Sequence, residues 1–247
     1  MKKYSYKKLT SSVILAFTIL LGFGSVNVYA EKISLTTENY PPFNMRSKDG
    51  SITGISTDIV KELFSRAGVD YEMHFLPWQR AYGKALKEEN SAVFSTTRTP
   101  EREELFKWVG PIVENNWVLL KKKDSDISLS SLEDAKKYKV GAYSGDATSL
   151  FLESEGFKVK NVAKDEKNVL KLQSGRIDLW ATGHLLGPYY AKQQGVSGLE
   201  PALVFKKTIM SLAFNKSADD ALINKLNAEL KKMVAEGVTE KIKSKYQ

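Results

Sequence analysis

Two arginines four residues apart, Arg98 and Arg102, are the side chains best suited to bind a small charged ligand. A guanidinium stays charged and offers a planar fork of donors that fits a carboxylate. Arg98 ends a predicted strand over 93–97, and Arg102 lies in a predicted short helix that Thr99 and Pro100 begin. Two arginines at one cleft would hold two acidic groups. The alternative for Arg98 is an ion pair at the surface or between domains. The alternatives for Arg102 are salt bridges to three acids, Glu38, Glu101 or Glu114.

The usual catalytic and metal-binding patterns are absent from the sequence. There is no Ser-His-Asp order, no HExxH helix and no P-loop. The absence of cysteine excludes disulfides, thiol nucleophiles, Cys-ligated metals and a Cys-anchored lipoprotein. His74 and His184 are too far apart to suggest a metal motif. We therefore predict neither a metal nor another cofactor, and a protein that is not an enzyme.

The first thirty residues are typical of a secretory signal peptide. Four lysines precede an apolar run from Val13 to Phe23, and Val28-Tyr29-Ala30 places small residues at a cleavage site. A membrane anchor is the alternative, but the run is about 11 residues long, whereas a membrane span needs roughly 20. We expect the mature chain to begin at Glu31 and to be periplasmic.

The charge of the mature chain gives no indication of nucleic-acid binding. The whole sequence has 37 basic and 29 acidic residues, a net charge of +8. Removal of the four leader lysines halves this excess, and the remaining lysines are scattered among acids. No basic surface interleaved with aromatic residues is predicted.

From Glu31 onward, short β-prone runs alternate with helical patterns, which predicts an α/β protein with largely parallel sheets. The 42% of hydrophobic residues suffice for one large or two modest cores. The polar stretch 121–126 separates two halves with the same strand and helix rhythm. We expect two lobes with a ligand cleft between them. The predicted strands cover 33–35, 93–97, 117–120, 140–142, 177–181 and 209–214, and the predicted helices 58–67, 79–86, 131–138, 147–152, 165–173, 184–193 and 222–234.

Several short motifs, in their order and spacing, resemble the family 3 periplasmic solute-binding proteins, which serve polar amino-acid ABC transporters. The resemblance covers residues 31–247. The motifs are Asn39-Tyr40-Pro41-Pro42-Phe43, Gly54-Ile55-Ser56-Thr57-Asp58, Thr99-Pro100-Glu101-Arg102, Phe106-Lys107-Trp108-Val109-Gly110-Pro111, Val140-Gly141 and Gly175-Arg176-Ile177-Asp178.

The resemblance implies a type II periplasmic binding protein fold, in which two α/β lobes are joined by two hinge strands. Lobe 1 would comprise residues 31–112 and 208–247, and lobe 2 residues 113–207. Arg102 would grip the ligand carboxylate in such a protein, while Ser95 and Thr97 would offer hydroxyls and backbone amides. Tyr40 would stack on the ligand, and Trp78 would line the opposite wall. Arg98 departs from the family pattern, which has an apolar residue there.

Lobe 2 departs further from the family pattern. Asp146, Ala147 and Thr148 lie where the family presents hydroxyl residues at a helix N-terminus, a natural anion site. Ala147 lacks the hydroxyl, so backbone amides and Thr148 remain. Gly183 stands where the family places an acid for the α-amino group of the ligand. The charge that would bind an ammonium group is missing at that position.

We therefore expect a monomeric periplasmic component of an ABC transporter that binds an amino acid or a related small carboxylate and delivers it to an inner-membrane permease. Closure of the lobes would supply the affinity. One alternative is an enzyme similar to cyclohexadienyl dehydratases, in which Glu38 or Glu114 would supply a proton. Another is a sensory module on the same fold.

Overall fold

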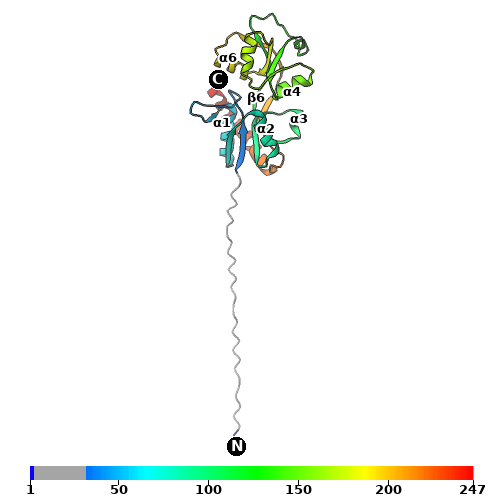
Figure 1. The fold of residues 1–247 in the computed structure, drawn as a ribbon. Helices are drawn as coiled ribbons and strands as arrows, with labels where there is room; N and C mark the ends of the chain where they lie inside the picture. Colours follow the sequence, from blue (N-terminus) through cyan, green and yellow to red (C-terminus); the bar gives the residue numbers. More distant parts are fainter. Residues whose placement is uncertain (3–31, 247) are drawn as a thin grey trace. The chain divides into compact units, whose positions relative to one another are not determined.

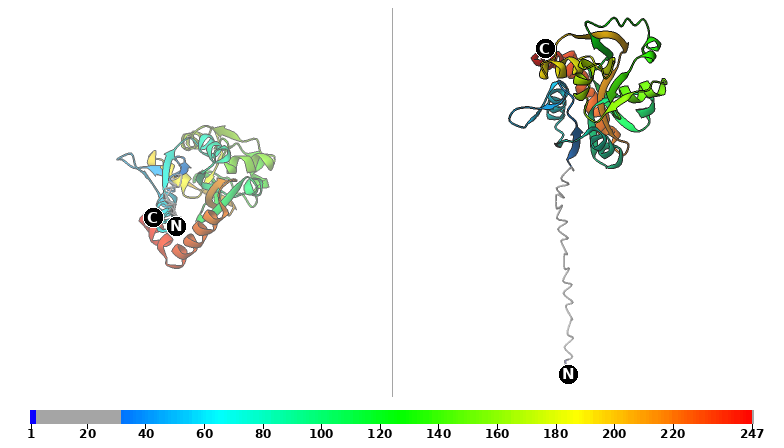
Figure 2. Two further views of the ribbon diagram at one scale, coloured as in Figure 1. Left: turned by 90° about the horizontal axis from the view of Figure 1, so that it is seen from below. Right: turned by 45° about the horizontal axis from the view of Figure 1, so that its top comes forward.

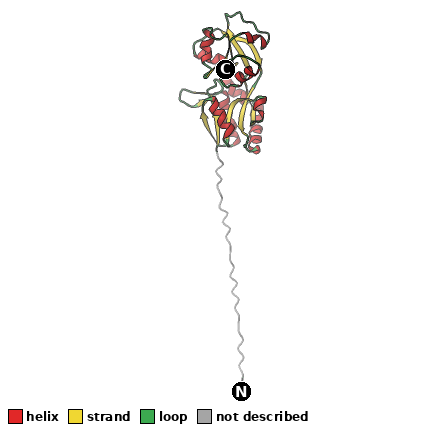
Figure 3. Cartoon of the chain, turned by 45° about the vertical axis from the view of Figure 1, so that its right-hand side comes forward, coloured by secondary structure: helices red, strands yellow, loops and turns green. Residues whose placement is uncertain are grey.

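A computed structural model describes residues 1–2 and 32–246. The predicted signal peptide lies almost entirely outside the described residues. From Lys32 on, the chain forms two separate five-stranded sheets with helices on both faces of each, which Figure 3 shows in yellow and red. We use lobe 1 and lobe 2 for the first and the second sheet with their helices.

The sheet of lobe 1 has the order β4-β1-β5-β12-β6. These strands are Tyr71–Phe75, Ile33–Thr37, Ser91–Thr97, Ile209–Asn215 and Phe106–Glu114. The pairs β1·β4 and β1·β5 are parallel, whereas β12 runs antiparallel to both β5 and β6. A small hairpin pairs β2 (Met45–Arg46) with β3 (Ile52–Thr53).

The sheet of lobe 2 has the order β11-β7-β10-β8-β9. These strands are Leu199–Lys206, Trp117–Lys122, Leu179–Gly183, Val140–Tyr143 and Lys160–Val162. As in lobe 1, two of the four strand pairs are parallel, here β10·β8 and β8·β9, and β7 is antiparallel to both of its neighbours. The expectation of largely parallel sheets holds for strand direction, since four strands of each sheet run the same way, but one strand, β12 in lobe 1 and β7 in lobe 2, runs against them. Both sheets are mixed because the chain leaves lobe 1 through β6 and returns through β12.

Helices cover both faces of the lobe 1 sheet. On one face α1 (Ile55–Ala67) buries Ile59, Leu63 and Phe64 and packs against α7 (Asp220–Ala235), which Figure 2 shows along the outside of the lobe. On the other face α2 (Trp78–Lys87) encloses a core with Val93, Phe106, Trp108 and Ala213. The remaining elements are α3 (Pro100–Glu103), α8 (Val238–Lys243) and the 3₁₀ helix Ser244–Tyr246.

Lobe 2 carries α4 (Ala147–Ser154), α5 (Lys167–Gln173) and α6 (Leu186–Gln193). Figure 1 shows α4 and α6 in one lobe and α1, α2 and α3 in the other. The helix predicted over 131–138 is a short 3₁₀ helix, Glu133–Lys137. The strand predicted over 177–181 begins two residues later, at Leu179. Strands β4, β6, β9 and β11 were not predicted.

Two short connections join the lobes, 115–116 between β6 and β7 and 207–208 between β11 and β12. They run side by side, because the backbone N–H of Asn115 donates to the backbone carbonyl of Thr208 at 2.9 Å and the Thr208 hydroxyl donates to the backbone carbonyl of Asn115. The predicted boundary at 112/113 falls inside β6 and that at 207/208 falls in the second connection. The extent of the two lobes as independent units stays a prediction.

Candidate ligand site between the lobes

Side-chain hydrogen bonds join the two lobes directly. The Trp78 indole, at the start of α2 in lobe 1, donates to the Gly145 carbonyl of lobe 2 at 3.0 Å. The Tyr143 hydroxyl, at the end of β8, donates to Glu38 Oε2 at 2.9 Å. These bonds show the lobes closed on each other, with Trp78 and Glu38 at the contact.

A cavity of about 300 Å³ lies where the lobes meet. Lobe 1 contributes the chain just after β1 and the turn before α2, and lobe 2 contributes the end of β8, the turn before α5 and one face of α6. The Asn39 side chain donates to the Tyr190 hydroxyl across the cavity at 3.2 Å. The lining residues are Glu38, Asn39, Tyr40, Phe75, Leu76, Pro77, Tyr143, Ala163, Lys164, Asp165, Glu166, Leu186 and Tyr190.

Arg102 is buried, with 7% of its surface exposed. Its guanidinium carbon lies 5.4 Å from the ring centre of Trp78 and 5.1 Å from that of Tyr82. The Nη1 group donates to the Thr97 carbonyl at 3.3 Å. Within residues 32–246, no carboxylate forms an ion pair with it. The salt bridges considered from the sequence are therefore not formed.

The helix that carries Arg102 begins as its sequence predicts. Thr99 takes an extended conformation at the N-cap and Pro100 occupies the first turn, but the Thr99 side chain makes no capping hydrogen bond. The helix has a single turn, so it directs Arg102 back toward the end of β5 and the aromatic face of α2.

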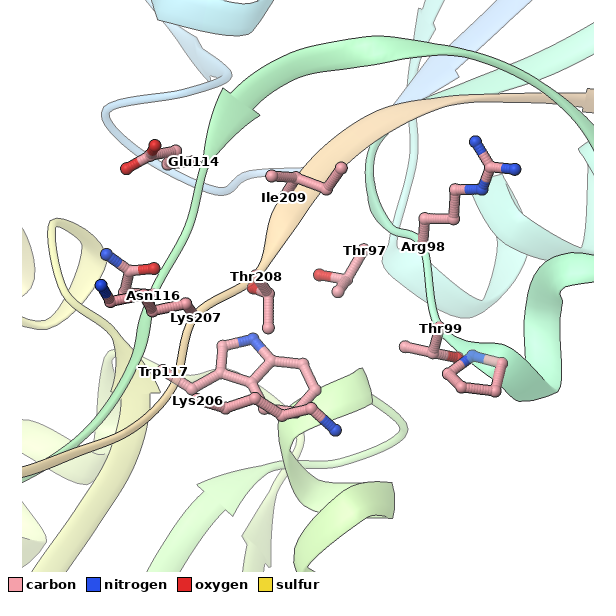
Figure 4. A pocket seen from close by; sticks show the side chains of 11 residues that line it. Thr97, Arg98, Thr99, Glu114, Asn116, Trp117, Lys206, Lys207, Thr208 and Ile209 are labelled. Atoms are coloured by element: carbon pink, nitrogen blue, oxygen red, sulfur yellow. The ribbon is translucent and has the colours of Figure 1, made fainter.

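Arg98 has a different environment. Its Nε donates to Glu103 Oε2 at 2.6 Å, and 42% of each of these two side chains is exposed. The guanidinium carbon lies 5.6 Å from the Trp108 ring centre. In Figure 4 the Arg98 side chain points away from the groove that Thr97 and Arg98 share with the two connections between the lobes. The structure therefore shows the surface ion pair for Arg98, and the two arginines contact different aromatic side chains.

The other lobe 1 residues with expected ligand contacts are largely buried. Ser95 has a positive φ of 60°, and its hydroxyl bonds to Asn44 Oδ1. Such a backbone conformation is costly for serine and is often found at functional sites. Thr97 is 5% exposed at the end of β5. Tyr40 is equally buried, and its hydroxyl accepts a hydrogen bond from Asn115 Nδ2 at 3.1 Å. Of these residues, Thr97 contacts Arg102 through its carbonyl, and Tyr40 lines the cavity between the lobes.

The N-terminus of α4 is partly occupied by its own cap. Asp146 accepts the Thr148 amide at 3.3 Å. This carboxylate takes a donor that an anionic ligand would otherwise use, and it places a negative charge at the helix end. Ala147 is buried, and the Thr148 hydroxyl is buried without a hydrogen-bond partner among the described residues.

Gly183 ends β10 in close contact with the first connection. A Cβ at this position would lie 2.4 Å from Asn115 Oδ1 and 3.2 Å from the Tyr40 hydroxyl. A side chain of any kind would displace these atoms. Gly183 is therefore required by the packing of Asn115, which the sequence did not indicate.

Two buried acids at the cavity were missed as site residues, and Glu38 is the first. The sequence placed it only as a possible partner of Arg102 or a proton donor. It is 8% exposed. Burial raises the pKa of its carboxyl well above the usual range, the Tyr143 hydrogen bond opposes this shift, and the negative charges of Asp146 and Asp165 add to it. Glu38 directly precedes the Asn39–Phe43 motif, a position that could have drawn attention to it.

Asp165 is the second acid, at the turn before α5 in lobe 2. It accepts hydrogen bonds from the Trp180 indole at 2.9 Å, the Thr182 hydroxyl at 3.0 Å and the side-chain amide of Asn168 at 2.9 Å. Burial raises its pKa to about 7, although these three donors lower it. The sequence offered only a polar residue at a predicted helix start.

The two histidines lie in unrelated places. His184 Nδ1 accepts a hydrogen bond from the backbone N–H of Asn116 at 3.1 Å, and burial lowers the pKa of the His184 ring. His74 pairs with Glu72 on the surface. Over the described part of the chain, no group of three or more His, Cys, Asp or Glu side chains is arranged to hold a metal ion.

Known proteins with similar sequences include transporter-binding proteins. A "Probable amino-acid ABC transporter-binding protein" of Haemophilus influenzae is 25% identical, over 98% of this chain and 96% of its own length. The "Arginine-binding extracellular protein ArtP" of Bacillus subtilis is 26% identical, over 100% of this chain and 98% of its own. None of the helices in the described residues is both long and apolar enough to cross a membrane.

Solved structures share the fold. An ancestral arginine-binding protein, solved with arginine and with glutamine, is 26% identical and covers 87% of this chain and 97% of its own, with a TM-score of 0.75. A histidine kinase sensor domain has a TM-score of 0.80 at 16% identity, over 87% and 95% of the two chains. An ancestral amino-acid-binding precursor of cyclohexadienyl dehydratase has a TM-score of 0.75 at 24% identity, over 87% and 94%. The two lobes are thus those of a type II periplasmic binding protein.

The sequence pattern of one family extends over both lobes. It matches residues 33–247, from the first strand to the last residue. The chain belongs to the bacterial extracellular solute-binding proteins, family 3.

Proposed function

We propose that this protein is the solute-binding component of an ABC transporter and that it holds an amino acid, or a closely related small carboxylate, between its two lobes. The closed form would then be recognised by an inner-membrane permease. The names of the relatives support the transporter context, since they include an amino-acid ABC transporter-binding protein and an arginine-binding extracellular protein.

The observation that carries this proposal is the buried Arg102. A guanidinium removed from water needs compensating interactions. Arg102 contacts the side chains of Trp78 and Tyr82 and the Thr97 carbonyl, but none of the acids among the described residues forms an ion pair with it. A ligand carboxylate would supply the missing anion in a bidentate geometry. Thr97 at the end of β5 and Trp78 at the lobe contact are its immediate neighbours, so that carboxylate would sit beside the surfaces that meet on closure.

Export follows from the same proposal. The predicted leader 1–30 would be removed during secretion, so that the mature protein begins at Glu31 outside the cytoplasmic membrane. The names of two relatives place them outside the cell or in the periplasm. Retention of Lys2 to Ala30 in the purified protein, shown by N-terminal sequencing, would contradict this.

The carboxylate grip can be tested by calorimetry with L-arginine and agmatine, its decarboxylated analogue. We expect L-arginine to bind and agmatine to bind at least tenfold more weakly. Arg102→Lys keeps the charge but loses the fork, and a charged hydrogen bond contributes about 1.5 to 3 kcal/mol. We therefore expect affinity for L-arginine to fall by roughly ten- to a hundredfold.

Arg98→Lys is the matched control, because its partner Glu103 lies on the surface. An exposed pair contributes little, so affinity should stay within about twofold. Equal losses in the two variants, or an unchanged affinity of Arg102→Lys, would place the ligand carboxylate elsewhere. A failure of all common amino acids to bind would contradict the proposed class of solute.

One observation favours a second candidate function, a dehydratase activity. Glu38 is a buried carboxyl beside the interlobe cavity, and its raised pKa suits a general acid. Incubation with prephenate or arogenate, followed by analysis of the products, tests this. Turnover that is lost in Glu38→Gln would establish an enzyme, and unchanged substrate would exclude this activity.

A further inference from the structure

The contact between Glu38 and lobe 2 brings several negative groups together when the lobes close. From lobe 2, Asp146, Asp165 and Glu166 lie near Glu38 or line the same cavity, together with Lys164 and the hydroxyls of Tyr143 and Tyr190. Lobe 1 contributes Tyr40 and the more distant charge of Arg102. Within the described residues, neither Glu38 nor Asp165 has an ion-pair partner.

The neighbours of Glu38 that affect its charge come mostly from the opposite lobe. Glu38 follows directly after β1, and the residue that donates to it, Tyr143, ends β8 in lobe 2. Separation of the lobes would remove Tyr143, Asp146 and Asp165 from its surroundings and admit water. Closure therefore buries this carboxylate and brings two further carboxylates toward it. The single hydrogen bond from Tyr143 stabilises the buried carboxylate by less than the loss of its hydration destabilises it.

We propose that Glu38 acts as a charge gate on closure: its carboxylate opposes closure of the solute-free protein, and either a proton or a cationic group of the solute in the cavity removes that opposition. The solute preferred by this site then carries a positive group on its side chain in addition to the carboxylate held by Arg102. This second statement rests on the proposed function, whereas the effect of the proton on closure does not.

The proton linkage has a definite sign. The closed form binds a proton at Glu38 more tightly than the open form, because burial raises the pKa of this carboxyl. Lower pH therefore favours closure. Between the pKa values of the two forms, the ratio of closed to open protein falls by up to tenfold for each unit that the pH rises.

Distance measurements between labels on the two lobes test the gate without any solute. The native chain has no cysteine, so Lys87→Cys on lobe 1 and Glu155→Cys on lobe 2, both exposed, carry spin labels without background. We expect the closed population of the otherwise unmodified protein to rise several-fold between pH 8 and pH 5. In Glu38→Gln, whose amide oxygen still accepts from Tyr143, we expect a high closed population at both pH values.

Two further variants separate the charge from other effects. Tyr143→Phe removes the interlobe hydrogen bond but keeps the carboxylate, so its closed population should be lower overall and still depend on pH. Glu89→Gln, at an exposed site after α2, should behave like the unmodified protein. A closed population that does not change with pH, or that changes equally in Glu38→Gln, would overturn the gate.

The cationic group is tested with L-arginine and L-citrulline, in which an uncharged ureido group replaces the guanidinium. We expect the unmodified protein to bind L-arginine roughly ten- to a hundredfold more tightly at pH 8, and Glu38→Gln to lose most of this preference. An equal preference in both proteins would refute a role of Glu38 in selecting a cation. If neither amino acid binds, the proposed class of solute fails, and the solute-free distances still decide the gate.

Discussion

Asp165 is a buried acid that is held by neutral donors alone. Trp180, Thr182 and Asn168 direct three hydrogen bonds at its two oxygens. These bonds stabilise the charged form, yet the loss of hydration outweighs them, since its pKa is raised to about 7. The carboxyl is therefore more easily ionised in the unfolded chain than in the folded protein.

This shift predicts a loss of stability as the pH rises. The unfolded carboxyl titrates near its usual value of 3.8 and the folded one near 7. The free energy of unfolding should thus fall between about pH 4 and pH 7, by a few kcal/mol at about 1.4 kcal/mol per unit, and then level off. Urea unfolding at pH 4.5 and pH 7.5 measures this difference.

Asp165→Asn should remove the part of that pH dependence that Asp165 contributes, while the part contributed by the buried Glu38 remains. The amide cannot accept all three donors, so stability at pH 4.5 should drop by about 1 to 3 kcal/mol. The exposed Asp124→Asn, whose carboxylate is 80% exposed, provides the control and should follow the unmodified protein. A slope as steep in Asp165→Asn as in the unmodified protein would assign the titration to another group.

At the scale of elements, the end of β10 packs so closely against the first connection between the lobes, 115–116, that no side chain fits between them. Gly183 faces Asn115, and Asn115 in turn donates to the hydroxyl of Tyr40. The packing of three segments that are far apart in the sequence therefore requires a glycine at position 183. The absence of Cβ at Gly183 lets the strand approach the connection at which the lobes join.

Gly183→Ala should disrupt this approach. The new Cβ would come within 2.4 Å of Asn115 Oδ1, and overpacking of this kind typically costs about 1 to 3 kcal/mol. We expect a lower melting temperature for Gly183→Ala and recovery of part of the loss in the double variant Gly183→Ala/Asn115→Ala. Additive losses in a double-mutant cycle would show that the two residues do not compete for space.

The sequence predicted best those elements that have a local signal. The helices α1 and α7 show apolar residues at helical spacing, α3 has Pro100 at its start, and β5 has a run of three apolar residues followed by β-prone threonines. Strand β6 was missed because Gly110 and Pro111 interrupt its pattern. Pairing with β12, far along the chain, is what defines β6 as a strand.

The candidate site shows the same limit. Arg102 could be identified from its motif and its chemistry. Glu38 and Asp165 are separated by more than a hundred residues, and nothing local indicates that they line one cavity. Their proximity depends on how closely the lobes approach one another. The close contact of Gly183 with Asn115 likewise depends on the folded arrangement of segments that are far apart in the sequence. The sequence indicated only that Gly183 lacks the acid that the family has at this position.

At the scale of the whole molecule, two tryptophans of lobe 1 make similar hydrogen bonds with different consequences. The Trp78 indole donates across the junction to the Gly145 carbonyl at 3.0 Å. The Trp108 indole donates to the Glu103 carbonyl at 3.1 Å, within lobe 1. Both side chains are largely buried, at 5% and 8% exposed. Only the first bond is gained on closure.

Trp78→Phe should therefore weaken solute binding, and Trp108→Phe should not. Phenylalanine keeps a ring beside Arg102 but loses the donor, and a hydrogen bond contributes about 0.5 to 1.5 kcal/mol. Calorimetry with L-arginine should show a roughly two- to tenfold lower affinity for Trp78→Phe. Trp108→Phe should lower the melting temperature with affinity unchanged. Equal affinities in both variants would contradict a role of the Trp78 bond in closure.

The passage of the chain from lobe 1 into lobe 2 and back also fixes the order in which the two sheets are completed during synthesis. β12 lies between β5 and β6 in the sheet of lobe 1, yet it follows every strand of lobe 2 along the chain. A growing chain therefore holds all the strands of lobe 2 before it holds the one that joins β5 to β6. Amino-terminal domains usually fold first on the ribosome. Here the lobe that begins first is completed last, and Thr97 at the end of β5 gains its pairing with Met210 of β12 only after almost the whole polypeptide has emerged.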